Sequence, residues 1–261
     1  MVDIEFKTSE ECRVELVAHT VMKDSPEWGD ELRQPGANFL PVSAARASFG
    51  REDKTGDDPE ADLKLMKYLA DHQHLTPFEY NHATFLVECP LFVRSQIHRH
   101  RTFAFNEISR RYTSEDISFW KPDNFRKQSK SNKQASTDEV IKTVPVTYHT
   151  YSIGEGRGED TVYDEDVVRL YEEPIWDAWV AYDKLVSGGV SREQARAVLP
   201  QSLITRFYMG GSLRNWVHFL KLRLDSHAQR EVQIVARKIE SQLRELWPEA
   251  MGVLLPIEET N

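Results

Sequence analysis

Apolar and polar positions alternate in two stretches of the chain, which are therefore predicted to be strands. Residues 13–22 (RVELVAHTVM) alternate well enough for an early strand. Residues 80–89 (YNHATFLVEC) are rich in aromatic and β-branched side chains, and the run ends at Pro90. Both stretches are short, as expected for the strands of a small sheet.

Helical periodicity of apolar positions covers more of the chain than strand-like alternation does. It predicts a short helix over residues 41–49 and an amphipathic helix over residues 60–71. A third helix begins at Pro90, includes the sequence RHR and runs to residue 101. A fourth covers residues 165–186 and is ended by Ser-Gly-Gly, and one long unbroken helix covers residues 212–246. Ser191, with Gln194 three positions later, is a capping-box signature for a further short helix.

Residues 121–165 differ in composition from the segments around them. QSKSNKQASTDE is polar, and three glycines fall within residues 154–158. This pattern indicates a long excursion with a mobile, glycine-rich tip, and the alternative is a hairpin built from VPVTYHTYSI. No internal repeat or domain boundary is apparent. The prediction is one α+β domain over residues 1–261, with long helices packed on a small, mainly antiparallel sheet.

Composition places the chain among ordinary globular proteins. Its 261 residues are 40% hydrophobic, which is enough for a sizeable core, and no apolar run approaches the roughly 18 residues of a membrane span. The N-terminus MVDIEFKTSEECRVELV lacks the basic start and apolar stretch of a signal peptide. Only two cysteines occur, Cys12 and Cys89. We therefore expect a cytoplasmic protein without disulfides that does not bind membranes.

Charge is distributed unevenly along the chain. The net charge of −9 argues against indiscriminate binding to nucleic acid, which relies on a broad basic surface. Between Arg94 and Arg111, however, there are five arginines, two histidines and one acid, Glu107. Guanidinium groups bind phosphate through paired hydrogen bonds, so this cluster predicts a small anionic ligand. The alternative is a basic helix whose charges are all in water.

Four motifs, in order, resemble those of the flavin-dependent thymidylate synthase family. The first is Arg99-His100-Arg101 followed by seven residues and Ser109, with the continuation NE-x-S-x-RY. The others are HLTPFEY (74–80), ARAVLPQSLITRFY (195–208) and LRNWVHFLKLRLDSHAQREVQ (213–233). The resemblance covers about residues 40–120 and 165–240.

This resemblance implies a reaction and an assembly. Members of the family reductively methylate deoxyuridine monophosphate (dUMP) to thymidylate (dTMP). The carbon comes from 5,10-methylenetetrahydrofolate, the hydride comes from NADPH through FAD, and no cysteine nucleophile takes part. The implied assembly is a homotetramer whose active sites are built from several chains, with no nucleic acid or metal.

The resemblance also implies roles for individual residues. Arg223 would be catalytic, stabilising the ionised uracil ring. FAD would be bound by His74, Thr76, Arg99, His100, Arg101, Glu107, Ser212, Arg214 and His218. The dUMP ligand would be bound by Gln96, Ile97, His98, Arg99, Glu107, Ile108, Ser109, Arg110, Arg111, Arg196 and Arg223. The chain departs from the family pattern at Tyr80, Ala104, Ser212 and His218.

Helix geometry suggests how the residues of the last motif are shared. At about 100° per residue, Arg214 and His218 lie roughly 40° apart, whereas Arg223 lies roughly 180° from Arg214 and 140° from His218. If the helix is unbroken, these side chains cannot easily serve one site. We therefore expect the helix to lie between two sites of an oligomer. The same helix carries an apolar stripe of Leu213, Val217, Leu220 and Leu224 that would face the core.

Nucleophilic catalysis by the protein has weak candidates. Cys89 ends an apolar strand, where a thiol pKa tends to rise, and Cys12 adjoins the first strand. Ser109 has no assured base beside it, so we expect it to hold the nucleotide. There is no G-x-G-x-x-G after a strand, so arginines would replace the usual helix N-terminus as the pyrophosphate site.

Two other functions compete with this one. The first is a metal-dependent hydrolase that uses His72, His74, His82, His98 and His100, although H-E-x-x-H and paired carboxylates are missing. The second is an RNA-binding module in which Phe103, Phe105 and Tyr112 stack on bases between arginines. The negative net charge counts against the second, and neither explains the other motifs.

Overall fold

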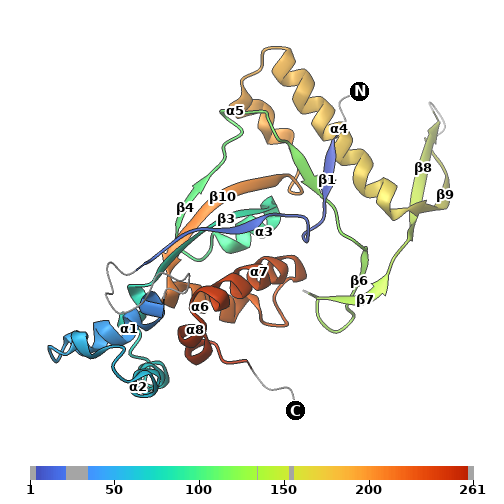
Figure 1. Ribbon diagram of the computed structural model, residues 1–261. Coiled ribbons are helices and arrows are strands. Elements are labelled where there is room, and N and C mark those ends of the chain that lie inside the picture. Colours follow the sequence, from blue (N-terminus) through green and yellow to red (C-terminus); the bar gives the residue numbers. More distant parts are fainter. Residues whose placement is uncertain (1–3, 22–34, 134, 153–155, 258–261) are drawn as a thin grey trace. The chain divides into compact units, whose positions relative to one another are not determined.

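The computed structural model describes residues 4–21, 35–133, 135–152 and 156–257 (Figure 1). The chain forms two compact units. The first consists of the chain up to Ser9 together with Ser109–Ile204, and the second of Glu10–Ile108 and the chain from Thr205 onward. The larger part of the first unit is therefore inserted between two strands of the second.

The second unit is built on a four-stranded sheet with the order β2-β3-β10-β4. These strands are β2 (Val14–His19), β3 (His82–Pro90), β4 (Ala104–Glu107) and β10 (Ile204–Ser212). β2 pairs antiparallel with β3, and β10 pairs antiparallel with β4. Side chains along β3 alternate between buried and half-buried, as expected when one face of a strand faces the core.

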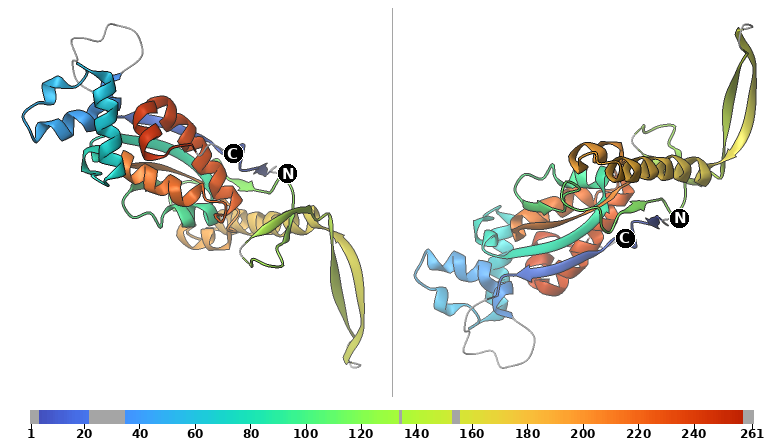
Figure 2. Two further views of the ribbon diagram at one scale, coloured as in Figure 1. Left: turned by 90° about the horizontal axis from the view of Figure 1, so that it is seen from below. Right: turned by 90° about the horizontal axis from the view of Figure 1, so that it is seen from above.

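Helices of the second unit pack on this sheet and on one another. They are α1 (Pro35–Ala47), α2 (Pro59–Asp71), α3 (Leu91–Ile97), α6 (Leu213–Arg223), α7 (Arg230–Leu246) and α8 (Pro248–Leu254), with short 3₁₀ turns η1 (Glu52–Lys54) and η2 (Thr76–Glu79). α7 packs on β2 and β3 (Figure 2). None of the described helices is long and apolar enough to cross a membrane.

Trp216 is the centre of the core of the second unit and fixes α6 on the sheet. Its ring packs edge-on against Phe103 at 4.5 Å and Phe85 at 5.0 Å between centroids. Its indole N–H donates to the carbonyls of Ala83, at 3.2 Å, and Gly211, at 3.1 Å. An aromatic side chain that is buried and also hydrogen-bonded holds one orientation, so the side chains of α6 project from a rigid element.

The first unit contains smaller sheets and one long helix. β1 (Glu5–Lys7) pairs parallel with β5 (Ser118–Trp120), β6 (Arg126–Gln128) pairs with β7 (Ser136–Val140), and β8 (Thr143–Ser152) pairs with β9 (Gly156–Asp166). α4 (Val167–Ser187) follows the long β8–β9 hairpin, which extends away from it in Figure 2. α5 (Arg192–Ala195) and η3 (Arg196–Val198) complete the unit.

Most of the predicted elements are confirmed. Strands occur within residues 13–22 and 80–89, and helices within or near 41–49, 60–71 and 165–186. The mixed fold, with helices packed on a small and largely antiparallel sheet, is also confirmed. Of the two readings of residues 121–165, the hairpin is correct, because β8 begins at Thr143 and pairs with β9. Of the three glycines of the predicted tip (residues 154–158), Gly156 and Gly158 belong to β9, and residues 153–155 lie outside the described residues.

The single long helix predicted over residues 212–246 is wrong. The chain leaves helical geometry after Arg223, and α7 begins only at Arg230. Asp225 explains the break, since its carboxylate accepts from the backbone N–H of His227 at 2.8 Å and from the His227 ring at 2.9 Å. A short acidic side chain that binds the backbone in this way offers an alternative to the helical hydrogen bond.

Two further predictions need correction. The helix expected from Pro90 through Arg101 ends at Ile97, because the N–H groups of Arg99 and His100 instead make tighter turn bonds to the carbonyls of Gln96 and Ile97. A short helix does follow Ser191, but no capping box forms. The Ser191 hydroxyl bonds to the Gln194 side chain at 3.4 Å and leaves the helix backbone uncapped.

Candidate active site

Arg223, the last residue of α6, reaches the end of α3 and forms the centre of the candidate site. Its Nε donates to Nε2 of His100 at 2.9 Å, and its Nη2 donates to the carbonyl of Gln96 at 3.3 Å. That carbonyl belongs to the last turn of α3, where the helix dipole is negative and a cation is stabilised. Two helix ends that are distant in sequence therefore meet through this one guanidinium.

No carboxylate among the described residues neutralises Arg223. Its described hydrogen bonds go to an imidazole nitrogen and a backbone carbonyl, and both acceptors are uncharged. The side chain is half-buried, and this burial lowers the pKa of Arg223 from its ordinary value. A partly desolvated cation without a counter-charge costs free energy, so this place favours an anionic ligand.

His100 accepts from Arg223 because its ring is uncharged. The residue is 7% exposed, and its ring packs edge-on against Phe219 with the centroids 4.9 Å apart. Burial, then the charge of Arg223, then His218 together lower the pKa of His100 to about 4. The ring of His218 lies 6.1 Å away. His218 and Arg223 therefore both flank His100, so the expectation that helix geometry keeps these two side chains apart is wrong.

Glu107 at the end of β4 is held by two residues that the sequence did not single out. Its Oε2 accepts from Nε of Arg94 at 3.0 Å and from Nη2 of Arg94 at 2.5 Å, and its Oε1 accepts from the Thr205 hydroxyl at 2.7 Å. Both carboxylate oxygens thus have protein partners. Arg94 is part of the basic segment. Its pairing with Glu107 joins α3 to β4, and the spacing of residues along the sequence does not predict this pair.

The other end of α6 carries a second group of predicted site residues. Arg214 forms an ion pair with Glu79 of η2, and His74 and Thr76 are exposed on the same segment. Arg214 and Arg223 lie about 13 Å apart along the helix axis, given the rise per residue. Ser212 is buried, and its hydroxyl accepts from the N–H of Asn215 as the N-cap of α6. Glu79 was missed, although it lies in the HLTPFEY motif.

The remaining predicted residues of the second unit differ in what they can offer a ligand. Arg99 and Arg101 are exposed in the turn after α3, whereas the Ile97 side chain is fully buried. The Ile108 N–H is occupied by the carbonyl of Arg206 at 2.9 Å. The His98 ring packs at a tilt against Phe105, with centroids 4.1 Å apart, and burial lowers the pKa of His98.

Four predicted residues belong to the first unit. Arg110 is buried, and its guanidinium donates to the carbonyls of Glu115 at 2.5 Å and Asp116 at 3.1 Å, so it closes the loop that it begins. Arg111 lies 3.8 Å from a carboxylate oxygen of Glu193. The Ser109 hydroxyl accepts from the N–H of Arg111 at 3.3 Å, and Arg196 is exposed on η3.

The donor groups of the second unit suit a phosphate-bearing cofactor. Arg99, Arg101 and His218 are exposed donors that have no carboxylate partner among the described residues. Guanidinium and imidazole groups of this kind bind pyrophosphate without a glycine-rich loop. The residues present therefore fit FAD in the chemistry of their donors.

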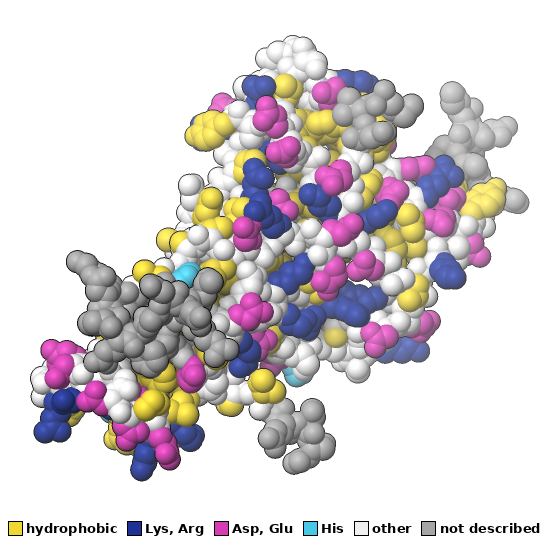
Figure 3. All heavy atoms as spheres, in the orientation of Figure 1, with side chains coloured by type: hydrophobic (Ala, Val, Ile, Leu, Met, Phe, Trp, Pro, Cys, Tyr) yellow, Lys and Arg dark blue, Asp and Glu magenta, His cyan; other side chains and the backbone are white. Residues whose placement is uncertain are grey.

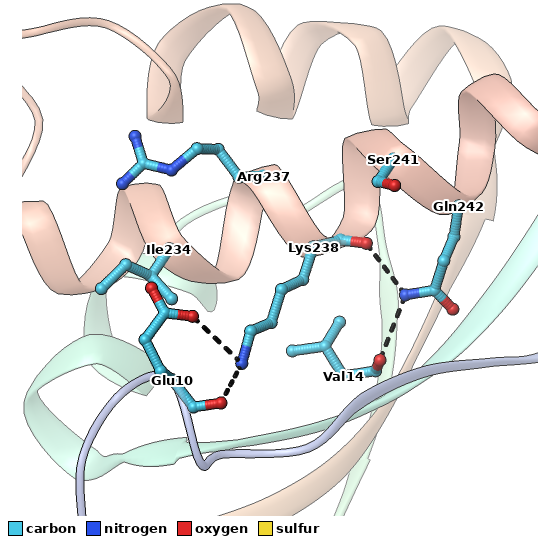
Figure 4. A pocket seen from close by; sticks show the side chains of 7 residues that line it. All are labelled: Glu10, Val14, Ile234, Arg237, Lys238, Ser241 and Gln242. Atoms are coloured by element: carbon cyan, nitrogen blue, oxygen red, sulfur yellow. Dashed lines mark hydrogen bonds and ion pairs between the residues drawn. The ribbon is translucent and has the colours of Figure 1, made fainter.

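A separate pocket of about 450 Å³ lies between α7 and the start of β2 (Figure 4). Its lining comprises Glu10, Val14, Ile234, Arg237, Lys238, Ser241 and Gln242, none of which is a predicted site residue. Lys238 donates to the carbonyls of Glu10 and Cys12, and Gln242 bonds to the backbone of Val14 and Leu16. Lys238 and Gln242 therefore hydrogen-bond to the protein backbone and link α7 to the start of β2, which indicates a structural role for this region.

The competing readings gain no support from side-chain placement. Across the described ranges, no three or more His, Cys, Asp or Glu side chains are grouped as a metal ion requires. On the face drawn in Figure 3, Lys and Arg side chains are interspersed with Asp and Glu. RNA binding through a broad basic surface would need one sign of charge over a larger area.

Comparison with known proteins gives consistent results. Residues 32–249 match the family model described as thymidylate synthase complementing protein. The flavin-dependent thymidylate synthase of Thermosipho melanesiensis is 39% identical over 82% of this chain and 83% of its own. That of Thermus thermophilus is 40% identical over 82% of this chain and 70% of its own. The crystal structure of the UMP/dUMP methylase PolB from Streptomyces cacaoi, bound with 5-Br dUMP, has a TM-score of 0.70, 30% sequence identity and 96% coverage of both chains.

The lowered pKa of His100 predicts a pH dependence of stability. In the unfolded chain His100 takes up its proton near pH 6.5, whereas in the folded chain it does so only at about 4. Below pH 6.5 the unfolded state therefore binds more protons, and the free energy of unfolding falls by up to about 3 kcal/mol as the pH drops to about 4.

Urea denaturation of the wild type, His100→Gln and the exposed control His19→Gln at several pH values measures this contribution. In His100→Gln the free energy of unfolding should decrease less on acidification than in the wild type, whereas the control should show the wild-type decrease. Equal pH dependence in the wild type and His100→Gln would contradict the assignment.

Proposed function

This chain belongs to the family of thymidylate synthase complementing proteins, the flavin-dependent thymidylate synthases, and we infer from its site that it methylates dUMP to dTMP. The carbon comes from 5,10-methylenetetrahydrofolate. When bound, FAD reduced by NADPH supplies the hydride that completes the methyl group.

The observation that carries the assignment of the site is the unneutralised charge of Arg223. Carbon 5 of uracil is a weak nucleophile until the ring acquires negative charge. A guanidinium beside the pyrimidine carbonyl stabilises that charge, and its effect is largest where water is partly excluded. Arg223 is half-buried and held by uncharged acceptors, so its positive charge is available for the ring.

Burial of both thiols supports a reaction without a cysteine nucleophile. Cys89 is 0% exposed, and burial raises its pKa well above the ordinary value. Cys12 is 2% exposed. A thiol that remains protonated and is closed off from solvent cannot attack carbon 6 of a bound nucleotide. The electrostatic route through Arg223 therefore replaces covalent catalysis. Two reduced cysteines also suit the reducing cytoplasm, where we propose that the enzyme works.

The ligand contacts that we propose follow the family motifs. FAD is assigned to His74, Thr76, Arg99, His100, Arg101, Glu107, Ser212, Arg214 and His218. The dUMP ligand is assigned to Gln96, Ile97, His98, Arg99, Glu107, Ile108, Ser109, Arg110, Arg111, Arg196 and Arg223. The Arg110 guanidinium also bonds to two loop carbonyls, those of Glu115 and Asp116.

The direct test of this function is an anaerobic absorbance experiment on protein reconstituted with FAD. NADPH should bleach the flavin bands, and adding dUMP with 5,10-methylenetetrahydrofolate should restore them while dTMP forms. Arg223→Lys should lower the rate of dTMP formation by roughly a hundredfold to a thousandfold, since a point charge replaces the oriented donors.

Arg237→Lys provides the matched control, because Arg237 is an exposed arginine of the separate pocket. This variant should retain the wild-type rate. A wild-type protein that takes up no flavin and forms no dTMP would overturn the proposed function.

We further propose that the enzyme is a homotetramer whose active sites combine residues of different chains. Arg214 and Arg223 leave α6 on opposite sides, and they contact different elements, η2 and α3. One bound ligand cannot easily use both faces of a helix. An assembly that presents each face to a different site makes use of both arginines.

Mixing two inactive variants tests this arrangement. Arg214→Ala and Arg223→Ala should each be poorly active alone, and subunit exchange between them should restore activity because some sites regain both arginines from different chains. Light scattering should give the mass of a tetramer. Complete exchange of subunits without any recovery of activity would contradict shared sites, and an active monomer would also contradict them.

A further inference from the structure

The contact between Arg223 and His100 is unusual because an arginine is held by an imidazole where a carboxylate would bind more strongly. Arg94 and Arg214 in the same unit both pair with glutamates. A carboxylate beside Arg223 would cancel the charge that a uracil anion needs. An uncharged acceptor orients the guanidinium and leaves its charge in place.

The surroundings of His100 keep its ring in the form that can accept. Its backbone N–H donates to the Ile97 carbonyl at 3.0 Å, which places the residue in the tight turn at the end of α3. The ring packs against Phe219 and is almost completely buried. Because Nε2 receives the N–H of Arg223, the ring proton must be on Nδ1.

We propose that His100 is a positioning residue for Arg223: it accepts from Nε, and with the Gln96 carbonyl it aims the free edge of the guanidinium at the pyrimidine of dUMP. A guanidinium carries five N–H donors, and the two described contacts use two of them. Within the part of the chain that the structure describes, no partner is seen for the remaining donors, so they can bind the substrate. This inference rests on the proposed function and assigns His100 a task distinct from contact with the flavin.

The second acceptor is fixed by the break between α6 and α7. The Gln96 side chain donates to Oε1 of Gln229 at 2.5 Å, and the Gln229 side chain in turn donates to Glu231 at 2.8 Å. These bonds tie the last turn of α3 to the first turn of α7. The residue that carries the second acceptor is therefore held against the start of α7, while Arg223 contacts its carbonyl and the His100 ring together.

A double-mutant cycle on the FAD-loaded enzyme tests the proposal, with the dissociation constant for dUMP as the readout at saturating flavin. His100→Phe keeps the aromatic packing but removes the acceptor, and should weaken dUMP binding about tenfold or more. In the Arg223→Met background the same change should have no further effect, because there is no guanidinium left to position. His100→Gln, which retains an acceptor, should recover part of the affinity, and the surface control His19→Phe should match the wild type.

Additive losses in the cycle, or a loss confined to flavin affinity, would overturn the positioning role while leaving the proposed function intact. A wild type that does not bind dUMP would overturn both. Nitrogen NMR of the wild type tests the contact without any variant. The His100 ring should carry its proton on Nδ1 near neutral pH, and a proton on Nε2 would exclude the hydrogen bond from Arg223.

Discussion

A half-buried arginine that keeps its charge is the constraint on which the rest of this site depends. Arg223 is partly removed from water, yet the described residues give it only uncharged acceptors. Such an arrangement costs free energy in the absence of a ligand and is repaid when an anion binds. The neutral state of His100, the end of α3 and the break after α6 are all parts of that arrangement.

The core of the second unit makes this costly arrangement possible. Trp216 is buried against Phe85 and Phe103 and is hydrogen-bonded to two carbonyls, which holds α6, and with it Arg223, in one orientation on the sheet. Active sites are commonly less stable than the scaffold that holds them, and a rigid aromatic core offsets the difference. Glu107, held by Arg94 and Thr205, extends the same rigid framework to the edge of the sheet.

The local pattern of apolar and polar residues was sufficient to predict most helices and strands. It did not predict where α3 and α6 end, and these helix ends form the candidate site. Alternation identified β2 and β3, and helical periodicity identified α2 and α4. The break at residues 224–229 has neither glycine nor proline, so its signal is only the side chain of Asp225 competing for the backbone. Pairs such as Arg94 with Glu107 and Arg214 with Glu79 join segments far apart in sequence, and periodicity carries no information about them. The motifs identified the family, but only the folded chain brings His100 to Arg223.

The most direct test of electrostatic catalysis is the rate of dTMP formation by a Cys12→Ala/Cys89→Ala variant whose fold and flavin content match the wild type. Because both thiols are buried and we propose that the charge of Arg223 activates the ring, the account predicts a rate within about threefold of the wild type. A loss of about a thousandfold or more in a folded, flavin-loaded variant would mean that a thiol attacks the substrate, and would contradict the central role given to Arg223.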